Sequence, residues 1–266
     1  MEDIIVLTGA AGRLGRSLRP MLASRCGELR VLDQLPLVAE HANEVAIEAD
    51  LNDTTALQQA MAGASAVVHF AGYPREADWP VLLAANVAAV TSLWEAARIA
   101  GVDRVLYASS NHAVGMYPRD TRIGHDALPL PDSRYGVTKV FLEAVSSLYA
   151  SKWGVRGFGM RIGHCSPAPT EARMLSHWIH PEDLGLLVQV GLDADYENEI
   201  VYGASSNARS WWSNIRALEL GYRPVHSADL HADRLAGLTS GDPVTEYFQG
   251  GTFASAQYAN PRHRPH

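Results

Sequence analysis

The stretch Ile4-Ile5-Val6-Leu7-Thr8-Gly9-Ala10-Ala11-Gly12-Arg13-Leu14-Gly15 decides the fold, because an apolar run is followed at once by regularly spaced glycines. The run predicts a strand that is buried on both faces. Gly9 and Gly12 would let the backbone approach a pyrophosphate at the N-terminus of the next helix, and Gly15 would permit that helix to pack closely on the strand. The position after the first strand favours a dinucleotide-binding turn over a structural turn with incidental glycines.

Short apolar runs alternate with helical patterns through the first half of the chain, as they do in parallel β-α-β units. Further strands are expected at 28–32, 45–49, 66–70, 104–108 and 156–161. Helices are expected over 82–99, ending at Gly101, and from about 135 to 153, ending at Gly154. Pro20 predicts that the first helix is kinked or short. The pattern predicts an α/β fold with a doubly wound, mostly parallel sheet of the Rossmann type.

The composition is that of a globular protein with a sizeable core, since 47% of the 266 residues are hydrophobic and 19% are charged. The net charge of −7 argues against non-specific binding to nucleic acid or to an anionic membrane. Cys26 and Cys165 have no ligand-spaced histidines beside them, so neither a disulfide framework nor a metal site is expected. No signal sequence precedes the first strand and no apolar run approaches the length of a membrane span, so we expect a cytoplasmic protein without membrane partners.

Acidic side chains follow the second and third expected strands. Asp33 lies 18 residues after Gly15, where a carboxylate accepts hydrogen bonds from an adenosine ribose and repels a 2′-phosphate. Gln34 and Leu35 supply no cation, although Arg13 could partly offset this repulsion, and we therefore expect NAD rather than NADP as the cofactor. Asp50-Leu51 lies where an adenine amino group could be met, and a plain turn aspartate is nearly as good an interpretation.

Tyr135 and Lys139 are four residues apart, which places them on one face of the helix expected there. An ammonium beside a phenol favours the phenolate, so this spacing can provide a base that works near neutral pH. The spacing by itself is frequent by chance. Its place 25 residues after Ser110, and far downstream of the glycine-rich turn, favours a functional interpretation.

Together with His69-Phe70-Ala71-Gly72, Asn86-Val87 and Ser109-Ser110, these motifs resemble the extended short-chain dehydrogenase/reductase superfamily over roughly residues 4–165. In that superfamily a serine, a tyrosine and a lysine are catalytic, which implies Ser110, Tyr135 and Lys139 here. Asn86 matches an asparagine that supports the active-site region. The resemblance implies cofactor contacts at Gly9, Gly12, Arg13, Leu14, Gly15, Asp33, Asp50, Leu51, Ala71, Gly72, Asn86, Tyr135 and Lys139.

A narrower resemblance extends over nearly the whole chain. The segments that look like those of the uronate dehydrogenases are 108–112, 117–118, 135–137, 161–163, 173–176, 203–205 and 248–253. Those enzymes oxidise C1 of a pyranose hexuronate, such as glucuronate or galacturonate, to an aldarolactone with NAD. The resemblance implies that Asn111 and His112 bind sugar hydroxyls and that Ser110 and Tyr135 meet the reacting hydroxyl. It also implies that Arg173 clamps the C6 carboxylate, which a guanidinium can hold through two hydrogen bonds.

Two positions depart from that resemblance. The uronate dehydrogenases usually carry a serine just after the His-x-Gly-Gly turn and another after Arg-Ile-Gly, where this chain has Pro74 and His164. His164 could donate to the substrate, could select a different sugar, or could be a loop histidine at the rim of the site. Arg173 could also pair with Glu171 or Glu182, and His112 could be a packed loop residue.

The pattern changes after Gly163. We expect 1–163 to be an NAD-binding Rossmann domain that carries the catalytic residues, and 164–266 to be a small substrate-binding part. In this second part we expect helices at 181–190 and 210–220, a short strand at 200–202, and a frayed tail at 262–266. Trp178, Trp211 and Trp212 are expected in its core. His180-Pro181-Glu182-Asp183 is interpreted as a helix start rather than as a set of ligands.

In the expected mechanism Tyr135 takes the proton from the C1 hydroxyl while the C1 hydride moves to NAD. Lys139 lowers the pKa of Tyr135, and Ser110 orients the reacting oxygen. The substrate would be a small sugar acid. Related enzymes often pair through the helices at about 84–100 and 135–153, so a homo-oligomer is expected. The alternatives are a lactone-forming dehydrogenase of a neutral aldose and, from another class, a non-catalytic NAD-sensing regulator.

Overall fold

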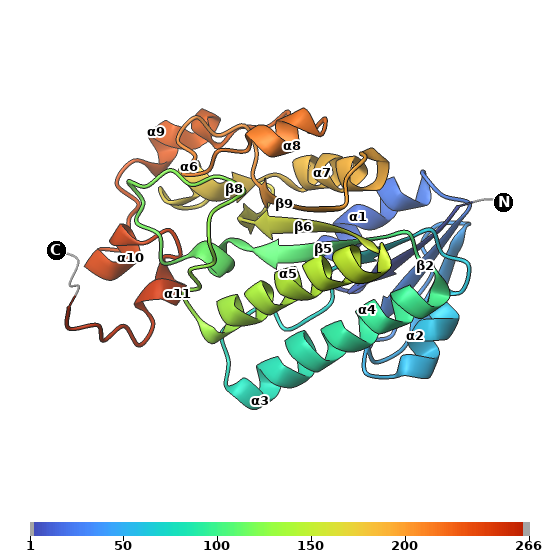
Figure 1. The fold of residues 1–266 in the computed structure, drawn as a ribbon. Helices are drawn as coiled ribbons and strands as arrows, with labels where there is room; N and C mark the ends of the chain where they lie inside the picture. The colour runs from blue at the N-terminus through green and yellow to red at the C-terminus, as the bar shows by residue number, and fades with distance from the viewer. Residues whose placement is uncertain (1–2, 263–266) are drawn as a thin grey trace.

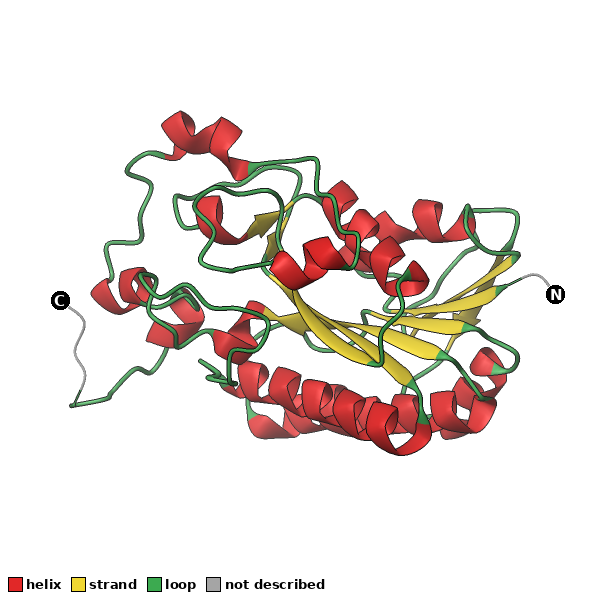
Figure 2. Ribbon diagram, turned by 45° about the horizontal axis from the view of Figure 1, so that its top comes forward, coloured by secondary structure: helices red, strands yellow, loops and turns green. Residues whose placement is uncertain are grey.

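A seven-stranded parallel sheet with the order β3-β2-β1-β4-β5-β6-β9 forms the centre of the protein (Figures 1 and 2). The structure is a computed structural model and describes residues 3–262. The order reverses at β1, which has β2 on one side and β4 on the other, and this confirms the doubly wound Rossmann-type sheet. The strands of the sheet are β1 (Ile4–Thr8), β2 (Glu28–Asp33), β3 (Glu44–Glu48), β4 (Ala66–His69), β5 (Arg104–Ser110), β6 (Arg156–Ile162) and β9 (Asn198–Gly203).

Helices cover both faces of the sheet (Figure 1). One layer contains α2 (Thr54–Met61), α4 (Ala89–Ala100) and α5 (Arg134–Trp153), and the other contains α1 (Arg13–Ala23) and α7 (Pro181–Asp193). Each layer buries its own apolar core against the sheet, with Leu93 and Trp94 of α4 on one side and Leu18 and Leu187 on the other. The remaining short elements are α3 (Trp79–Leu82), η1 (Leu83–Ala88), η2 (Asn111–Val114), β7 (His164–Cys165), α6 (Met174–His177), β8 (Trp178–Ile179), α8 (Ile215–Glu219), η3 (Ala228–His231), α9 (Ala232–Leu235), α10 (Pro243–Tyr247) and α11 (Thr252–Ser255).

The glycines of the first turn allow α1 to approach the sheet, as the sequence predicts. Gly9 has a φ of +73°, and a Cβ built on it would lie 2.5 Å from the backbone nitrogen of Ala71. A Cβ on Gly15 would overlap the carbonyl oxygen of Gly9. A side chain at either position would therefore push the helix away from the turn. Pro20 lies near the end of α1, which continues only to Ala23 and is a short helix of 11 residues.

One helical segment is more apolar than the sequence analysis anticipated. Trp79–Ala100 is 22 residues long and has a mean hydropathy of 1.3, so by length and composition alone it could cross a membrane. This differs from the expectation that no apolar run approaches the length of a span. Leu82, Leu93 and Trp94 of this segment are fully buried in the fold, which accounts for its apolar character by packing on the sheet. Its middle part, η1, is a π-helix, the irregularity that places Asn86.

The C-terminal part differs from its predicted layout. β9 pairs in parallel with β6, and Leu184, Leu187 and Val188 of α7 pack in the same core as β1. A division of the chain at 163/164 would therefore cut through the sheet, because residues 181–203 supply its last strand and a covering helix. The helix expected at 210–220 is also wrong, since it is limited to α8, and Trp212 instead forms a bridge to Ile123. The predicted tail, apart from Arg262, lies outside the described residues.

Helix α5 is joined to the middle of the sheet by a buried ion pair. Arg161 on β6 donates from Nε and Nη2 to the two carboxylate oxygens of Glu143, each at 2.9 Å, and both side chains are at most 5% exposed. Ser109 on β5 donates to the same carboxylate at 2.6 Å. Because the pair is two-pronged and buried, it fixes the rotation of α5 about its axis as well as its distance from the sheet.

Replacing Glu143 by glutamine should destabilise the protein strongly, because the guanidinium of Arg161 would stay buried without its counter-charge. We expect a loss of about 3–5 kcal/mol in the free energy of unfolding, which corresponds to a fall in Tm of roughly 10 °C. Thermal unfolding followed by circular dichroism measures this. Glu219→Gln removes a partner of Arg216 at the surface and is the control, with an expected loss under about 1 kcal/mol. Equal losses in the two variants would contradict the role given to the buried pair.

Candidate active site

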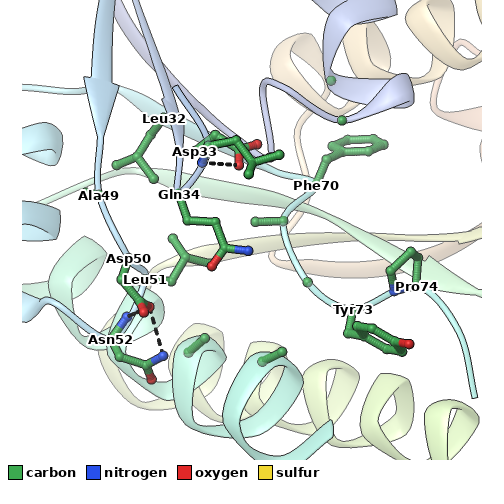
Figure 3. Close-up of a pocket in the computed structure, with 18 of the residues that line it drawn as sticks. Leu32, Asp33, Gln34, Ala49, Asp50, Leu51, Asn52, Phe70, Tyr73 and Pro74 are labelled. Atoms are coloured by element: carbon green, nitrogen blue, oxygen red, sulfur yellow. Dashed lines mark hydrogen bonds between the residues drawn. The ribbon is translucent and has the colours of Figure 1, made fainter. Parts of the chain in front are cut away.

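A cleft of about 540 Å³ lies at the carboxyl ends of β1, β2, β3 and β4 (Figure 3). Its volume is in the range of pockets that hold small molecules and cofactors, about 300–1,000 Å³. It lies at the point where the strand order reverses, which is where open parallel sheets bind ligands. The predicted cofactor-binding residues that line it are Gly9, Gly12, Arg13, Leu14, Gly15, Asp33, Asp50, Leu51, Ala71 and Gly72.

Asp33 and the start of α1 provide the polar features on one side of the cleft. The Asp33 carboxylate accepts hydrogen bonds from the backbone nitrogens of Ala11, at 3.0 Å, and Leu35, at 3.1 Å, so it is held beside the glycine turn. The first turn of α1 contains no acidic side chain, and its N-cap, Gly12, has none to offer. An anion is favoured at such a helix start. A fixed carboxylate next to an anion site fits the ribose and pyrophosphate of NAD.

Gln34 and Asp50 extend into the cleft from the ends of neighbouring strands (Figure 3). Asp50 accepts hydrogen bonds from the backbone and side-chain nitrogens of Asn52, at 2.8 and 2.9 Å, and this turn holds its carboxylate. The sequence analysis did not select Asn52 as a site residue, and it considered Gln34 only to note that this side chain supplies no positive charge. Their position directly after parallel strands was the signal that could have identified them.

Ser110, Tyr135 and Lys139 come together at the carboxyl end of β5, outside the wall of the cleft. All three residues are at most 8% exposed. The ammonium of Lys139 donates to the carbonyl oxygen of Ala108 at 2.9 Å and lies 5.4 Å from the centre of the Tyr135 ring. A hydrogen bond links the side chains of Ser110 and Tyr135. The three residues that the sequence predicted to be catalytic are therefore neighbours.

The electrostatics of this group differ from the predicted ones. Burial raises the pKa of Tyr135 to about 12, while the Ser110 hydrogen bond opposes this and the Asp132 charge adds to it. Burial also lowers the pKa of Lys139 to about 8, against the influence of Glu143. The expected lowering of the Tyr135 pKa by Lys139 is wrong for this structure, because desolvation of the phenol is the largest influence.

Asn86 is not among the residues that line the cleft, and it supports the site by hydrogen bonds to the neighbouring loop and helix. Its Oδ1 accepts from the backbone nitrogen of Tyr73 at 2.7 Å, and its Nδ2 donates to the Tyr73 carbonyl at 3.0 Å and to Thr138 at 3.1 Å. It thereby ties the loop after β4 to helix α5. Glu76, which the sequence analysis missed, makes a second tie, since its carboxylate accepts from the backbone nitrogen of Tyr135 at 2.9 Å and pairs with Arg134 at 3.0 Å. Pro74 lies in the same loop and lines the cleft.

His112 lies beside Tyr135, with the two ring centres 5.8 Å apart. Its Nδ1 is 2.7 Å from a buried oxygen of Asp132, which orients the ring. Phe253 of α11 stacks on this imidazole at 3.9 Å and is 6.0 Å from the Tyr135 ring, so the three rings form one cluster. Asn111, which precedes His112 in the chain, has a buried Nδ2 with no hydrogen-bond partner. Such an orphan donor needs an acceptor, so Asn111 and His112 offer polar groups to a ligand at this place.

Arg173 is brought to the site by the C-terminal segment. Its Nη2 donates to the carbonyl of Gln249, and a Cβ on Gly251 would lie 2.6 Å from its Nε, an atom that is buried without a partner. The nearest carboxylate oxygen, on the half-exposed Glu171, is 3.9 Å from Nη1. Burial, followed by the charge of Arg119, lowers the pKa of Arg173 to about 10. A guanidinium that is buried without a close counter-ion is suited to bind an anion.

His164 lies on β7, between the two halves of the site. Burial lowers its pKa, with smaller influences from Arg13 on one side and Arg173 on the other. Arg13 reaches across to the carbonyl of Cys165, the neighbour of His164. His164 therefore lies within electrostatic range of both arginines, which agrees with a position at the site or at its rim.

The segment His180-Pro181-Glu182-Asp183 starts a helix, as predicted. His180 is the N-cap of α7 and its Nδ1 accepts from the backbone nitrogen of Glu182 at 3.2 Å. His180, Glu182 and His226 place possible metal-ligand atoms within 4.8 Å of one another. The rings of His180 and His226 are stacked, however, 3.6 Å apart at 28°. Nearly parallel rings direct their lone pairs alongside each other instead of toward a common point, so this arrangement fits a helix cap.

Comparison with known proteins agrees with the fold and the cleft. Residues 5–212 match the NAD dependent epimerase/dehydratase family. A uronate dehydrogenase from Pseudomonas putida is 38% identical over 95% of this chain and 96% of its own length. A mutant uronate dehydrogenase from Agrobacterium tumefaciens, solved in complex with NAD, superimposes with a TM-score of 0.90 at 35% identity, over 98% of this chain and 99% of the other.

A third relative has a different named substrate. It is an NAD-dependent glucose-6-phosphate dehydrogenase from Haloferax volcanii, 35% identical over 84% of this chain and 94% of its own length. Fold, cleft and matched residues together place the chain: it belongs to the NAD dependent epimerase/dehydratase family, with uronate dehydrogenases among its relatives.

Proposed function

We propose that the protein is an NAD-dependent dehydrogenase that oxidises C1 of a hexuronate, such as glucuronate or galacturonate, to an aldarolactone. The observation that carries the proposal is the buried guanidinium of Arg173, which has no close counter-ion. It is connected to Tyr135 through the segment that contains Gly251 and Phe253. An anion clamp and a phenolic acid-base group in one site suit a sugar that carries a carboxylate at the end opposite C1.

NAD would be held by the residues of the cleft. The glycine turn and the start of α1 would face the pyrophosphate, Asp33 would accept from the adenosine ribose, and Asp50 and Leu51 would lie at the adenine. When bound, NAD supplies the hydride acceptor of the reaction. The ammonium of Lys139, which donates to Ala108 of β5, would bind a hydroxyl of the nicotinamide ribose.

The proton chemistry belongs to the chain itself. Tyr135, in its phenolate form, accepts the proton of the C1 hydroxyl and becomes the neutral phenol, and Ser110 hydrogen-bonds the same oxygen and orients it. Since burial raises the pKa of Tyr135, the phenol is protonated at rest, and it must first lose its proton to solvent to act as the base, a step that positive charge near it would favour. Asn111 and His112 bind the ring hydroxyls, and Phe253, stacked on the His112 imidazole, holds that ring in place.

A second candidate substrate is a hexose 6-phosphate, which also places an anion at C6. The observation that favours it is His164, because this ring and the Arg173 guanidinium are close enough to influence each other's charge. A phosphate accepts more hydrogen bonds than a carboxylate. A neutral aldose, by contrast, has no anionic group that could pair with the buried charge of Arg173.

Three further assignments belong to the same proposal. We assign the substrate lobe to 164–180 and the segments after β9, since 181–203 complete the sheet.

Two copies would pair through the outer faces of α4 and α5, where Ile99, Leu148 and Trp153 are exposed, and sedimentation equilibrium tests this pairing. We place the enzyme in the cytoplasm, where NAD and sugar acids are available, and cell fractionation tests this location.

Replacing Tyr135 by phenylalanine should reduce kcat by about 100- to 10,000-fold, the range that a general base contributes. The KM for NAD should stay nearly unchanged, because the cleft is not altered. Initial rates of NADH formation measure both quantities. Tyr149→Phe on the same helix is the control, since that hydroxyl bonds Glu95 in the helix layer, and it should keep full activity. Undiminished turnover in Tyr135→Phe would refute the mechanism.

Replacing Arg173 by alanine should raise the KM for a hexuronate by roughly 10- to 100-fold, because the hydrogen bonds of a charged pair are lost. The same change should raise the KM for a hexose 6-phosphate and leave that for a neutral aldose unaltered. Arg173→Lys keeps the charge but not the two-pronged geometry, so its effect should be intermediate. Arg209→Ala removes an exposed guanidinium as a control. An unchanged KM for every anionic sugar in Arg173→Ala would remove the basis for the proposed substrate.

A further inference from the structure

His177 is bound on both sides of its ring to a single residue, Arg173, one helical turn earlier in the chain. Its Nδ1 is 2.9 Å from the carbonyl oxygen of Arg173, and its Nε2 is 3.0 Å from Nη1 of the same residue. The residue is 2% exposed. His177 was not among the residues that the sequence analysis selected, and nothing in the proposed reaction uses it directly.

These two contacts fix the protonation of the ring. A carbonyl oxygen only accepts hydrogen bonds, so Nδ1 carries the hydrogen. A guanidinium only donates, so Nε2 must be the acceptor and therefore has no hydrogen. Protonation of Nε2 would set two donors and two positive charges against each other. Burial and then the charge of Arg173 hold the pKa of His177 well below its ordinary value, in agreement with a neutral ring.

The other hydrogen-bond partner of Arg173 is also uncharged, and the nearest carboxylate oxygen, on Glu171, is 3.9 Å from Nη1. Nη2 donates to the carbonyl of Gln249, a residue that is itself anchored through its side chain to Trp212 and to the carbonyls of Pro118 and Thr121. The Trp211 ring lies parallel to the His177 ring, 5.6 Å away at 6°, and the Arg173 guanidinium is 5.9 Å from the centre of the same indole. The guanidinium is thus oriented by neutral groups, which leave its charge available to a ligand.

We propose that His177 is a positioning residue for the anion clamp, holding the Arg173 guanidinium in the orientation that receives the substrate carboxylate without neutralising it. The inference rests on the proposed function, because it gives Arg173 the carboxylate of the substrate. A carboxylate side chain in place of His177 would orient the guanidinium equally well, but it would occupy the charge that the substrate needs. A neutral acceptor avoids this competition.

The test compares variants that keep or remove the acceptor. His177→Phe and His177→Leu remove it, and phenylalanine retains an aromatic ring against Trp211. His177→Gln keeps an amide oxygen as acceptor and an amide hydrogen as donor, so it is the conservative variant. The steady-state kcat and KM for glucuronate and galacturonate, the KM for NAD, and Tm are measured for each. His180→Phe, at the start of α7, is the matched control for loss of a histidine ring.

We expect the acceptor-free variants to raise the KM for the hexuronate by about 10-fold, which corresponds to about 1.4 kcal/mol of binding. The kcat and the KM for NAD should change by less than about 2-fold, since binding of the carboxylate is weakened equally in the ground state and the transition state. His177→Gln should restore the KM to within about 3-fold of the parent value, a difference of under about 0.7 kcal/mol. His177→Glu should raise the KM more than either acceptor-free variant, because its carboxylate competes with the substrate. In a protein that already carries Arg173→Ala, His177→Phe should add no further increase.

Separate outcomes overturn the two claims. If Arg173→Ala raises the hexuronate KM but neither His177→Phe nor His177→Leu does, the positioning role is wrong and the proposed function stands. The role is also overturned if the two variants lower kcat and Tm while KM stays constant, or if His177→Phe raises KM equally in the Arg173→Ala background. If Arg173→Ala itself leaves the KM of every anionic sugar unchanged, the proposed function fails first.

Discussion

The buried pair of Glu143 and Arg161 is the interaction on which the geometry of the site depends. It joins α5 to β6, and Ser109 attaches the same carboxylate to β5. Tyr135 and Lys139 lie on α5, and Ser110 lies at the end of β5, so the pair sets the distance between the elements that carry the three residues. A buried ion pair is not in itself a strong source of stability. Its two-pronged geometry makes it a strong constraint on orientation.

The site is built from two halves that are assembled in different ways. The cofactor half consists of segments that directly follow the strands of one sheet, so its geometry comes from the sheet itself. The substrate half combines β5, α5 and α6 with the segment from Gln249 to Phe253 near the end of the chain. Gly250 and Gly251 let this segment lie against Asp132 and Arg173, where any Cβ would collide with their side chains. The C-terminal segment thereby closes the site over both the imidazole and the guanidinium.

Features formed by residues close together in the sequence could be predicted, whereas features formed by residues far apart in the sequence could not. The glycine turn, Asp33 and the Tyr135–Lys139 spacing lie within single strand–helix units, and their positions were correctly predicted. The pairing of Arg173 with Gln249 joins residues 76 apart, and the stacking of Phe253 on His112 is equally non-local, so no spacing could reveal them. The shift of the Tyr135 pKa was missed for a related reason, because burial is a property of the folded chain. The place of β9 in the sheet was not predicted, since β9 resembles an isolated short strand in sequence and acquires its place only by pairing with β6.

The reaction centre lies at the end of β5 and the anion clamp is Arg173 in the substrate half, and we propose that the two act on opposite ends of the same sugar. The most direct measurement is ¹³C NMR of a reaction mixture that contains the purified protein, NAD and a hexuronate labelled at C1. The account predicts that the anomeric signal is replaced by that of a lactone carbonyl, with NADH formed in equal amount. NADH formation with the label still at an anomeric carbon, or no turnover of any hexuronate while a neutral aldose is oxidised, would contradict it.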